Sequence, residues 1–96
     1  MTQYVLSPRA QADLEDIWAF TTNRWGLTQA EVYIRQIQSS IETVAAAPAL
    51  GRACDEIRSG YRKYRTGSHV IFYRLTDGGI DVVRILHARM DFGRHL

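Results

Sequence analysis

Three histidines, His69, His87 and His95, are the side chains of this sequence best suited to proton transfer, and all lie in its C-terminal half. His87 stands between Arg84 and Arg89, and in a ribonuclease a histidine can act as general acid–base while arginines hold the scissile phosphate. Histidines near arginines are also common in strands, where they hydrogen-bond in or beside the core. Without a fixed geometry, this structural interpretation is favoured over the catalytic one.

The run Tyr61-Arg62-Lys63-Tyr64-Arg65 mixes aromatic and basic side chains and is predicted to form a strand. Side chains alternate between the two faces of a strand, so Tyr61, Lys63 and Arg65 point one way while Arg62 and Tyr64 point the other. Three interpretations fit equally well. The run could bind single-stranded nucleic acid by stacking and phosphate contact, form an edge strand whose charges discourage aggregation, or dock an acidic protein segment.

Most enzyme and cofactor signatures are absent from the sequence. It contains no glycine-rich phosphate loop, no GxSxG elbow, no HExxH helix and no paired cysteines for zinc. Cys54 stands alone and is expected to be a small, partly buried side chain. Asp55 and Glu56 have no histidine nearby, which favours a solvated loop. We therefore expect no metal site and no cofactor.

Basic residues are concentrated in the second half of the chain. Residues 1–48 carry three arginines and five acids, a net charge of −2, whereas residues 49–96 carry eight arginines, one lysine and five acids, a net charge of +4. The planar guanidinium of arginine suits carboxylates, phosphates and protein interfaces. The second half is therefore predicted to present a partner-binding surface.

The length and composition indicate a single folded domain over residues 1–96. The chain is 46% hydrophobic and 23% charged, which is the balance of a globular protein. Its apolar runs fall far short of the about 20 residues that a membrane-spanning helix needs. The N-terminal sequence lacks the features of a signal peptide. The resulting expectation is a cytoplasmic protein without membrane association.

The first helix is marked at both ends. Tyr4–Leu6 is a short β-type run, after which Ser7 and Pro8 fit the N-cap and first position of a helix that ends at Gly26. The predicted apolar stripe of this helix comprises Leu14, Ile17, Trp18, Thr21 and Trp25. Both tryptophans are expected to pack in the core or within the helical hairpin.

A second helix follows at once. Thr28 and Glu31 have the spacing of a capping box with Thr28 as the cap, and Pro48 ends the helix. The predicted apolar stripe comprises Ala30, Tyr33, Ile34, Ile37, Ile41 and Val44. The link between the two helices is so short that they must form an antiparallel hairpin.

Three β-type runs, Tyr61–Arg65, His69–Thr76 and Ile80–His87, follow a connector over residues 49–60. The sequence Asp-Gly-Gly at residues 77–79 is a hairpin signal. The predicted fold class is therefore α+β in the order β-α-α-β-β-β. In this fold a short N-terminal strand and an antiparallel helical hairpin pack on a C-terminal antiparallel β-sheet.

Several multi-residue phrases in this order resemble the ParE toxins of the RelE/ParE superfamily. The likeness covers Tyr4–Leu96 and begins with Ser7–Ala10 before an acidic helix. Its most specific phrases are PALGR at 48–52, DEIR at 55–58, GSHVIFYR at 67–74, RILHARMD at 84–91 and the closing RHL at 94–96. The resemblance implies the RelE/ParE-like version of the α+β fold.

The resemblance also implies a function. ParE toxins inhibit DNA gyrase and are neutralised in a complex with a ParD-type antitoxin encoded beside them, whereas the RelE branch of the superfamily cleaves mRNA on the ribosome. Val70 occupies the place where RelE-like nucleases have an arginine, and His95 stands about where a catalytic tyrosine is expected. We therefore expect a binding toxin that has no catalytic residues and does not bind nucleic acid directly.

Two alternatives remain open at the level of sequence. One is a ribosome-dependent mRNA interferase, an endoribonuclease built from His87, Arg62, Lys63 and Arg89, of which the last two fall near basic positions of RelE-like nucleases. The other is a relic that still binds an antitoxin but has no target. A short upstream reading frame with a ribbon-helix-helix pattern would support a toxin–antitoxin pair.

Residues 70–73 are apolar on both faces of their strand, so one face can pack on the hairpin while the other needs cover. We expect an antitoxin segment that is disordered when free to cover this second face and to place acids beside basic side chains. The expected antitoxin-binding residues are Arg62, Arg65, Val70, Phe72 and Arg74.

Residues 89–96 combine two arginines, a histidine and three large apolar side chains, and they are too few to form a stable isolated helix. One interpretation is structural, with Met90, Phe92 and Leu96 closing the core. Arginines beside large apolar groups are also typical of interface hot spots. We expect Arg89, Arg94 and Leu96 to contribute to target binding more than to folding.

Overall fold

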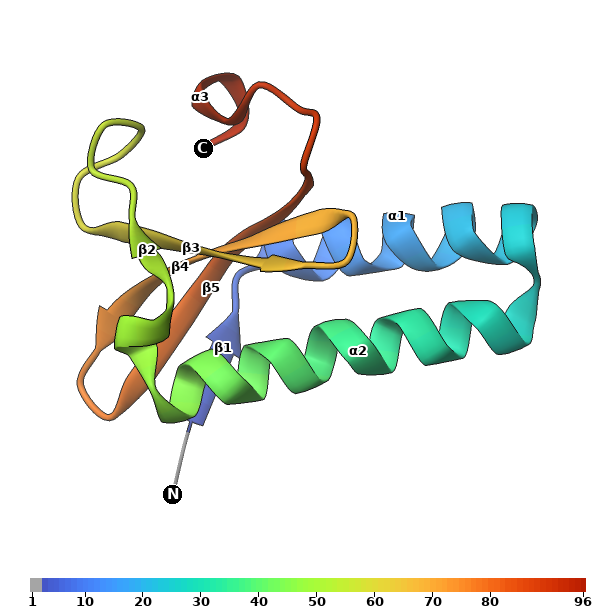
Figure 1. Cartoon of the computed structure of the whole chain (residues 1–96), viewed down its shortest axis with the longest axis horizontal. Helices are drawn as coiled ribbons and strands as arrows, with labels where there is room; N and C mark the ends of the chain where they lie inside the picture. The colour runs from blue at the N-terminus through green and yellow to red at the C-terminus, as the bar shows by residue number, and fades with distance from the viewer. Residues whose placement is uncertain (1–2) are drawn as a thin grey trace.

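The computed structural model describes residues 3–96 and places a helical hairpin on one face of a five-stranded sheet, with the C-terminal segment on the other face (Figure 1). The strand order across the sheet is β1-β5-β4-β3-β2. The elements are β1 (Gln3–Leu6), α1 (Pro8–Trp25), α2 (Leu27–Ala46), the 3-10 turn η1 (Pro48–Leu50), β2 (Arg52–Ala53), β3 (Tyr61–Thr66), β4 (His69–Thr76), β5 (Gly79–His87) and α3 (Phe92–His95). The predicted α+β class is confirmed.

The start of α1 is built as the sequence predicts. Ser7 Oγ accepts a hydrogen bond from the Ala10 N–H at 3.0 Å, and its own hydroxyl donates to the Val83 carbonyl of β5 at 2.7 Å. Pro8 lies in the first turn, where its missing N–H leaves no bond unmade. Ser7 therefore caps the helix and also joins it to the sheet. At the other end, Gly26 has a φ of +94°, which favours glycine and turns the chain directly into α2.

The capping box predicted for α2 is wrong. The helix begins at Leu27, its N-cap is Gly26, and no side chain caps it. Because the glycine leads straight into the helix, Thr28 already lies in the first turn and cannot serve as the cap that Glu31 would complete. The antiparallel hairpin itself is present as predicted, with α1 and α2 side by side along their length (Figure 1).

The sheet differs from the prediction at both edges. β3, β4 and β5 form the expected antiparallel meander, but β1 pairs with β5 in parallel, so the complete sheet is mixed. A further strand, β2, was not predicted from the sequence; it pairs with β3, Arg52 opposite Lys63 and Ala53 opposite Arg62. Over this stretch β3 is consequently not an edge strand, and the interpretation of its charges as a guard against aggregation does not apply there.

The Tyr73 hydroxyl holds the connector against the sheet. It donates to the Pro48 carbonyl at 2.6 Å and accepts the Gly51 N–H at 2.9 Å. Burial raises the pKa of Tyr73, which keeps the hydroxyl protonated as a donor. The ring lies so close to Gly51 that a Cβ at this position would overlap it. These long-range contacts set the position of β2.

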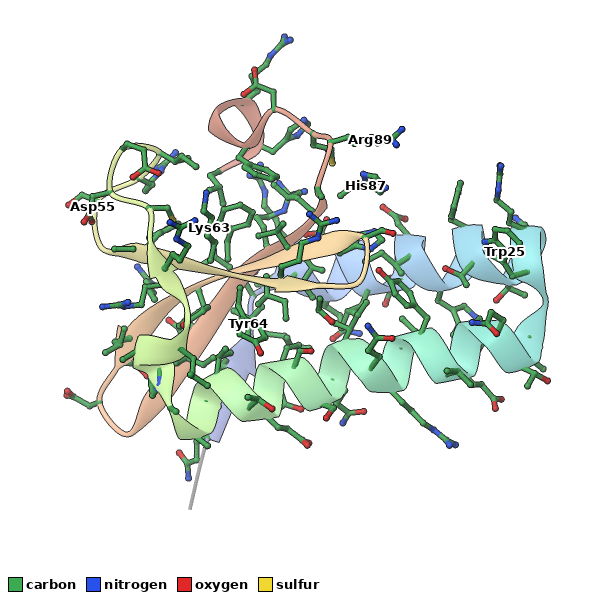
Figure 2. All side chains as sticks on the ribbon, in the orientation of Figure 1. Trp25, Asp55, Lys63, Tyr64, His87 and Arg89 are labelled. Carbon is green, nitrogen blue, oxygen red and sulfur yellow. The ribbon has the colours of Figure 1, made fainter. Side chains whose placement is uncertain are left out.

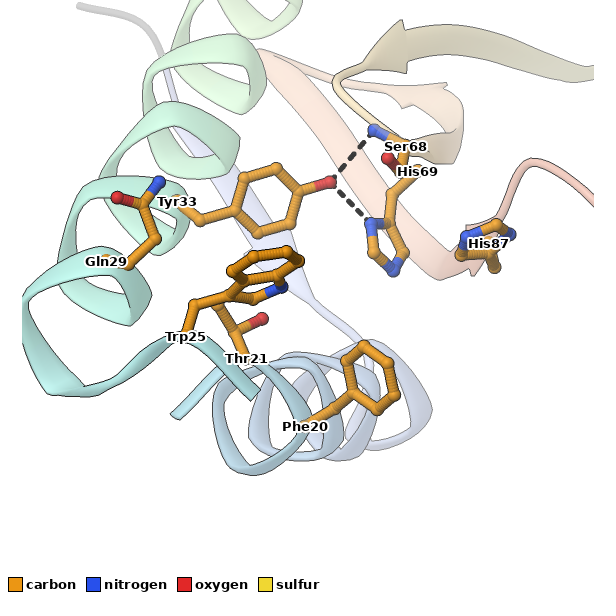
Figure 3. A pocket seen from close by; sticks show the side chains of 8 residues that line it. All are labelled: Phe20, Thr21, Trp25, Gln29, Tyr33, Ser68, His69 and His87. Atoms are coloured by element: carbon orange, nitrogen blue, oxygen red, sulfur yellow. Dashed lines mark hydrogen bonds between the residues drawn. The ribbon is translucent and has the colours of Figure 1, made fainter. Parts of the chain in front are cut away.

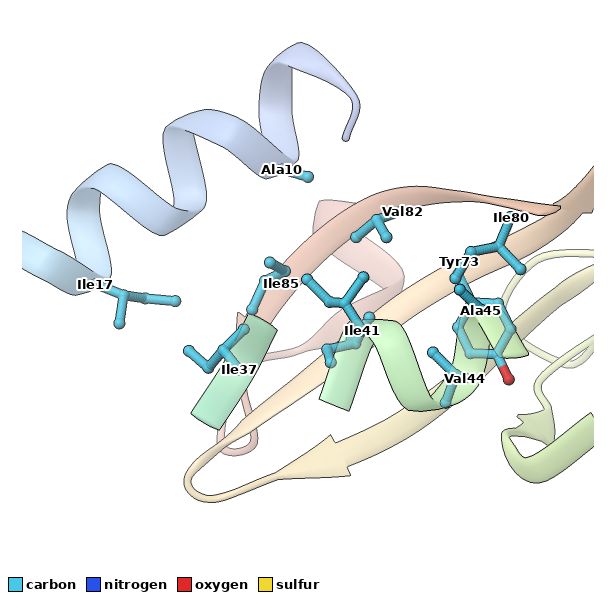
Figure 4. Packing of buried hydrophobic residues seen from close by; sticks show 11 residues of the cluster. Ala10, Ile17, Ile37, Ile41, Val44, Ala45, Tyr73, Ile80, Val82 and Ile85 are labelled. Carbon is cyan, nitrogen blue, oxygen red and sulfur yellow. The ribbon is translucent and has the colours of Figure 1, made fainter. Parts of the chain in front are cut away.

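The hairpin-side core fills the space between the two helices and the sheet (Figure 4). Its buried members are Ala10, Ile17, Ile37, Ile41, Val44, Ala45, Ile71, Tyr73, Ile80, Val82 and Ile85. The stripe predicted for α2 is buried or half-buried throughout. Trp18 of α1 is half-buried, but Trp25 is 66% exposed, so its prediction as a packing residue is wrong. The reason is that the last turns of α1 extend past the end of the sheet (Figure 1).

The tail-side cluster covers the opposite face of the sheet. It consists of buried Cys54, Val70, Phe72 and Leu86 packed against Ile57, Tyr61, Ala88, Phe92 and Leu96. The chain's own C-terminal segment therefore supplies the cover that the sequence analysis expected from a partner. Cys54 is more deeply buried than predicted, and burial raises the pKa of its thiol. Within residues 3–96, no helix is both long and apolar enough to cross a bilayer.

Candidate functional site

The C-terminal segment, residues 88–96 and called the tail below, docks on the sheet through the short helix α3. The Phe92 ring meets the buried Phe72 ring edge to face, with the ring centroids 4.8 Å apart. Leu96 is half-buried against the same cluster. Phe92 and Leu96 therefore close this part of the core, as one interpretation of the segment predicted. Met90 does not take part and is 36% exposed.

A largely buried ion pair connects the hairpin, the sheet and the tail. Arg84 of β5 donates to the Asp13 carboxylate of α1 through Nε at 2.8 Å and through one terminal nitrogen at 2.9 Å. The same carboxylate accepts the Ile85 N–H at 2.9 Å. The other terminal nitrogen of Arg84 donates to the His95 carbonyl at 2.7 Å. Hydrogen bonding to Asp13 raises the pKa of Arg84, so one permanent charge holds both a helix and the tail.

The tail is held largely by its main chain, which leaves its arginines facing solvent. Arg84 binds the His95 carbonyl, and Arg58 donates to the Leu96 carbonyl. Arg89 and Arg94 are exposed, and neither forms a salt bridge within residues 3–96. Two of the three predicted target-binding residues are therefore accessible, and the third, Leu96, is half-buried as an anchor.

The residues of the alternative ribonuclease site do not converge. Lys63 points to the tail-side face of the sheet, whereas Arg62 points to the hairpin-side face and donates to a main-chain carbonyl of the connector at 2.7 Å. His87 lies at the end of β5, with Arg89 just beyond it (Figure 2). A general acid–base and its phosphate-binding groups must face one reacting centre, and these four side chains lie on both faces of the sheet.

The predicted antitoxin-binding residues are also dispersed. Val70 is 7% and Phe72 0% exposed, so they do not form the exposed patch that the sequence predicts. The physical reason is that the tail packs on them. Arg62 is half-buried and bound to the connector, while Arg65 is exposed. Arg74 is also exposed and pairs with a neighbouring aspartate at 3.3 Å.

A pocket that the sequence analysis missed lies between the hairpin and one end of the sheet (Figure 3). This hairpin-end pocket has a volume of about 440 Å³ and is walled by Phe20, Trp25 and Tyr33 from the helices and by His69 and His87 from adjacent strands. The available signal was the position of Phe20 off the predicted apolar stripe of α1. An aromatic side chain at such a position cannot reach the hairpin-side core.

Hydrogen bonds orient the two imidazoles of this pocket, and Figure 3 shows the one between Tyr33 and His69. The Tyr33 hydroxyl accepts the Ser68 N–H at 3.0 Å and lies 2.6 Å from His69 Nδ1. The Arg89 N–H donates to His87 Nδ1 at 3.1 Å, and the two histidine rings meet edge to face at 5.2 Å between centroids. Burial, reinforced by neighbouring His87, lowers the pKa of His69 to about 4, so this ring is neutral near pH 7.

The connector loop carries exposed acids but no metal centre. Asp55, at the outer edge of the molecule in Figure 2, and Glu56 face solvent as predicted. The Asp55 carboxylate accepts the Gly60 N–H at 2.7 Å. Across residues 3–96, no group of three or more His, Cys, Asp or Glu side chains is placed to hold a metal ion. The accessible features are thus the tail arginines and the hairpin-end pocket.

The overall fold is shared with a solved structure. One chain of the structure titled "Chromosomal ParDE TA system from P. aeruginosa" superposes with a TM-score of 0.78 at 18% sequence identity, covering 91% of this chain and 96% of that chain. The two chains therefore share one α+β fold.

Sequence comparison identifies the family. The family model described as "ParE toxin of type II toxin-antitoxin system, parDE" matches residues 4–92. Toxin ParE1 of Mycobacterium tuberculosis is 59% identical over 96 residues, covering 99% of this chain and 98% of the relative. Toxin ParE1 of Caulobacter vibrioides is 44% identical over 96 residues, covering 100% and 99% respectively. The chain belongs to the ParE toxin family of type II toxin–antitoxin systems, as the resemblance predicted.

Proposed function

We propose that the chain inhibits DNA gyrase by binding it, through the tail, and that a cognate ParD-type antitoxin neutralises it. Family membership supports the proposal, and so does a tail that presents Arg89 and Arg94 to solvent beside the partly exposed Met90. Arginine beside apolar surface is the composition of interface hot spots. In this proposal Leu96 anchors the tail on the sheet while the two arginines meet the target.

Inhibition by binding, without catalysis, is supported by the separation of the candidate nuclease residues. Lys63 lies on one face of the sheet and Arg62 on the other, so the two cannot hold one scissile phosphate. Gyrase acts on DNA inside the cell, so the proposal includes a cytoplasmic location.

The antitoxin forms a hetero-oligomer with the chain in this proposal. Its acidic side chains would pair with exposed cations such as Arg65 and Arg74. Val70 and Phe72 would join that interface only after the tail has left the sheet, because both are buried beneath it.

A supercoiling assay tests the role of the tail. The full chain should stop purified gyrase from supercoiling DNA, and truncation after Asp91 should abolish inhibition while antitoxin binding and the circular-dichroism spectrum persist. Because truncation also removes core-closing side chains, the Arg89→Ala/Arg94→Ala double variant gives the sharper test. The Arg52→Ala/Arg65→Ala double variant is the matched control, since both of its sites are exposed arginines outside the tail. Equal inhibition by both double variants would rule out the tail as effector.

A ribosome assay tests the absence of catalysis. The purified toxin should leave mRNA on translating ribosomes intact, and His87→Ala should retain most of the toxicity. Site-specific cleavage that disappears in His87→Ala would contradict inhibition by binding and would identify the chain as a RelE-type interferase.

A further inference from the structure

The hairpin-end pocket is bordered by unusually exposed apolar side chains. Phe20 and Trp25 project from the last turns of α1 with 62% and 66% of their surface exposed, and Leu27 at the start of α2 is 56% exposed. Large aromatic groups around a cavity are typical anchor points for partners, because docking removes much of their apolar surface from water. This surface is separate from the hydrogen bonds by which Arg58 and Arg84 hold the main-chain carbonyls of the tail.

The inner end of the pocket offers hydrogen-bond donors. The 2.6 Å distance from Tyr33 Oη to His69 Nδ1 is short for an N–H donor and normal for a hydroxyl donor. The Tyr33 hydroxyl therefore donates to Nδ1, and the proton of the neutral His69 ring lies on Nε2. His87 Nδ1 likewise accepts the Arg89 N–H, so a neutral His87 also carries its proton on Nε2. Within residues 3–96 neither Nε2–H has an acceptor at hydrogen-bond distance.

The rim of the pocket is positively charged. The Arg24 guanidinium lies 5.8 Å from the centroid of the Phe20 ring, and Arg89 lies two residues after His87, the last residue of β5. Neither arginine forms a salt bridge within residues 3–96. The described pocket walls contain no carboxylate. Asp13 and Asp16 belong to the adjoining groove, where Asp13 is paired with Arg84. Donors and positive charge around an apolar cavity complement a carboxylate-bearing segment with an apolar side chain.

We propose that the antitoxin anchors an acidic segment in the hairpin-end pocket by inserting one large apolar side chain between Phe20, Trp25 and Tyr33. Carboxylates that flank this side chain accept from the imidazole Nε2–H groups and pair with Arg24 and Arg89. The inference rests on the proposed function because it requires an antitoxin. It places the main antitoxin-binding site at the hairpin end and not on the sheet face that carries Val70 and Phe72. Arg89 also belongs to the proposed target surface, so an antitoxin bound here masks part of that surface.

A second copy of the chain is a poorer occupant of the pocket. Self-association through this surface would bring Arg24 and Arg89 of both copies together without supplying carboxylates from the pocket walls. Like charges that meet at an interface oppose association. A volume of about 440 Å³ suits a large side chain and its neighbours.

Calorimetric titration of the full-length toxin with its antitoxin measures the contribution of the pocket. Trp25→Ala should weaken binding about 30-fold and Phe20→Ala about 10-fold, as expected for aromatic hot spots. The matched control is Leu75→Ala on β4, which truncates a side chain that is 56% exposed and should change affinity less than about 2-fold. All three sites are exposed, so circular dichroism should show an unchanged fold.

Fluorine NMR gives a direct readout of contact at the pocket. The chain has two tryptophans, so fluorotryptophan labelling should give two resonances, which the Trp18→Phe variant assigns. Addition of antitoxin should move the Trp25 resonance and move that of half-buried Trp18 less.

The outcomes separate this inference from the proposed function. If the wild-type toxin does not bind the antitoxin, the proposed function fails and the inference fails with it. If the wild type binds and Trp25→Ala binds equally well, the inference alone is overturned. A Trp25 resonance that moves with toxin concentration alone, with antitoxin affinity unchanged in Trp25→Ala, would identify a self-association surface and would also overturn it.

Discussion

The two faces of the sheet are covered in different ways. On the hairpin side, α1 and α2 contribute 18 and 20 residues and bury the larger set of apolar side chains. On the tail side, residues 88–96 contain a helix of only four residues. The first cover consists of interdigitated side chains, whereas the second combines a few apolar contacts with main-chain carbonyls held by arginines.

Equal burial therefore does not imply an equal free energy of exposure. Ile37 and Phe72 are each 0% exposed. Exposing Ile37 requires the separation of two long helices from the sheet, whereas Phe72 is covered by the short tail together with Ile57 and Tyr61. The free energy of local opening depends on how many buried contacts are broken. The hairpin side thus determines whether the chain folds, and the tail side determines what the sheet can contact.

The largest effect is expected from truncation on the hairpin side. Ile41→Ala removes a side chain that is 1% exposed and leaves a cavity, so it should lower the free energy of unfolding by about 3 kcal/mol. Ile57→Ala truncates a half-buried isoleucine on the tail side and should cost about 1 kcal/mol. Urea denaturation measures both, and equal losses would remove the distinction between the two covers.

Breaking the Asp13–Arg84 ion pair should loosen both the helical hairpin and the tail, because Arg84 holds both. Asp13→Asn leaves Arg84 without its charged partner in a largely buried site, so we expect a loss of about 2 kcal/mol in the free energy of unfolding. Amide hydrogen exchange in residues 92–96 should also become faster. Asp81→Asn is the control, because its pair with Arg74 is exposed and should contribute less than about 0.5 kcal/mol. Unchanged exchange in the tail would mean that Arg84 does not link the two covers.

Loosening the tail alone should have a smaller energetic effect. Phe92→Ala removes the edge-to-face contact with Phe72 and should lower the free energy of unfolding by about 1 kcal/mol. A dye that fluoresces on apolar surface should bind more strongly to this variant than to Met90→Ala, whose side chain lies outside the tail-side cluster. Equal dye binding would show that the tail does not seal this face.

The smallest effect is a pH dependence at the end of the sheet. Burial lowers the pKa of His69 from an ordinary value of 6.5 to about 4, so the unfolded chain binds more protons between these values. This contribution to stability is fully present above pH 6.5 and is lost as the pH falls towards 4. His69→Gln should show a shallower loss of stability over this interval, measured by urea denaturation at stepped pH. Identical slopes in the two proteins would contradict the assignment to His69.

Sequence signals predicted structure well wherever neighbouring residues determine it. Ser7 and Pro8 mark a helix start because the cap and the fixed proline φ act within one turn. The range His69–Thr76 matches β4 because a run of apolar residues ends at a glycine turn. By the same logic, the Thr28 capping box failed because Gly26, two residues earlier, is the N-cap of the helix.

Features that depend on distant contacts could not be predicted. β2 has two residues and no periodicity, and the Tyr73 hydroxyl fixes its place from across the fold. The Asp13–Arg84 pair joins residues 71 positions apart in the sequence. For the candidate site, composition alone indicated that the tail carries accessible arginines. The docking of the tail depends on Arg84, which binds both Asp13 of α1 and the His95 carbonyl. The hairpin-end pocket depends on where Phe20 and Trp25 of α1 lie relative to the end of the sheet.

The parallel pairing of β1 with β5 also imposes an order on folding during synthesis. β1 pairs with residues 79–82, and the Ser7 hydroxyl bonds to a carbonyl 76 positions later. A growing chain can form the helical hairpin early, because its contacts are local, but it cannot complete the sheet until β5 has left the ribosome. Nascent chains halted before residue 79 therefore remain incompletely folded, because β1 and Ser7 still lack their partners on β5.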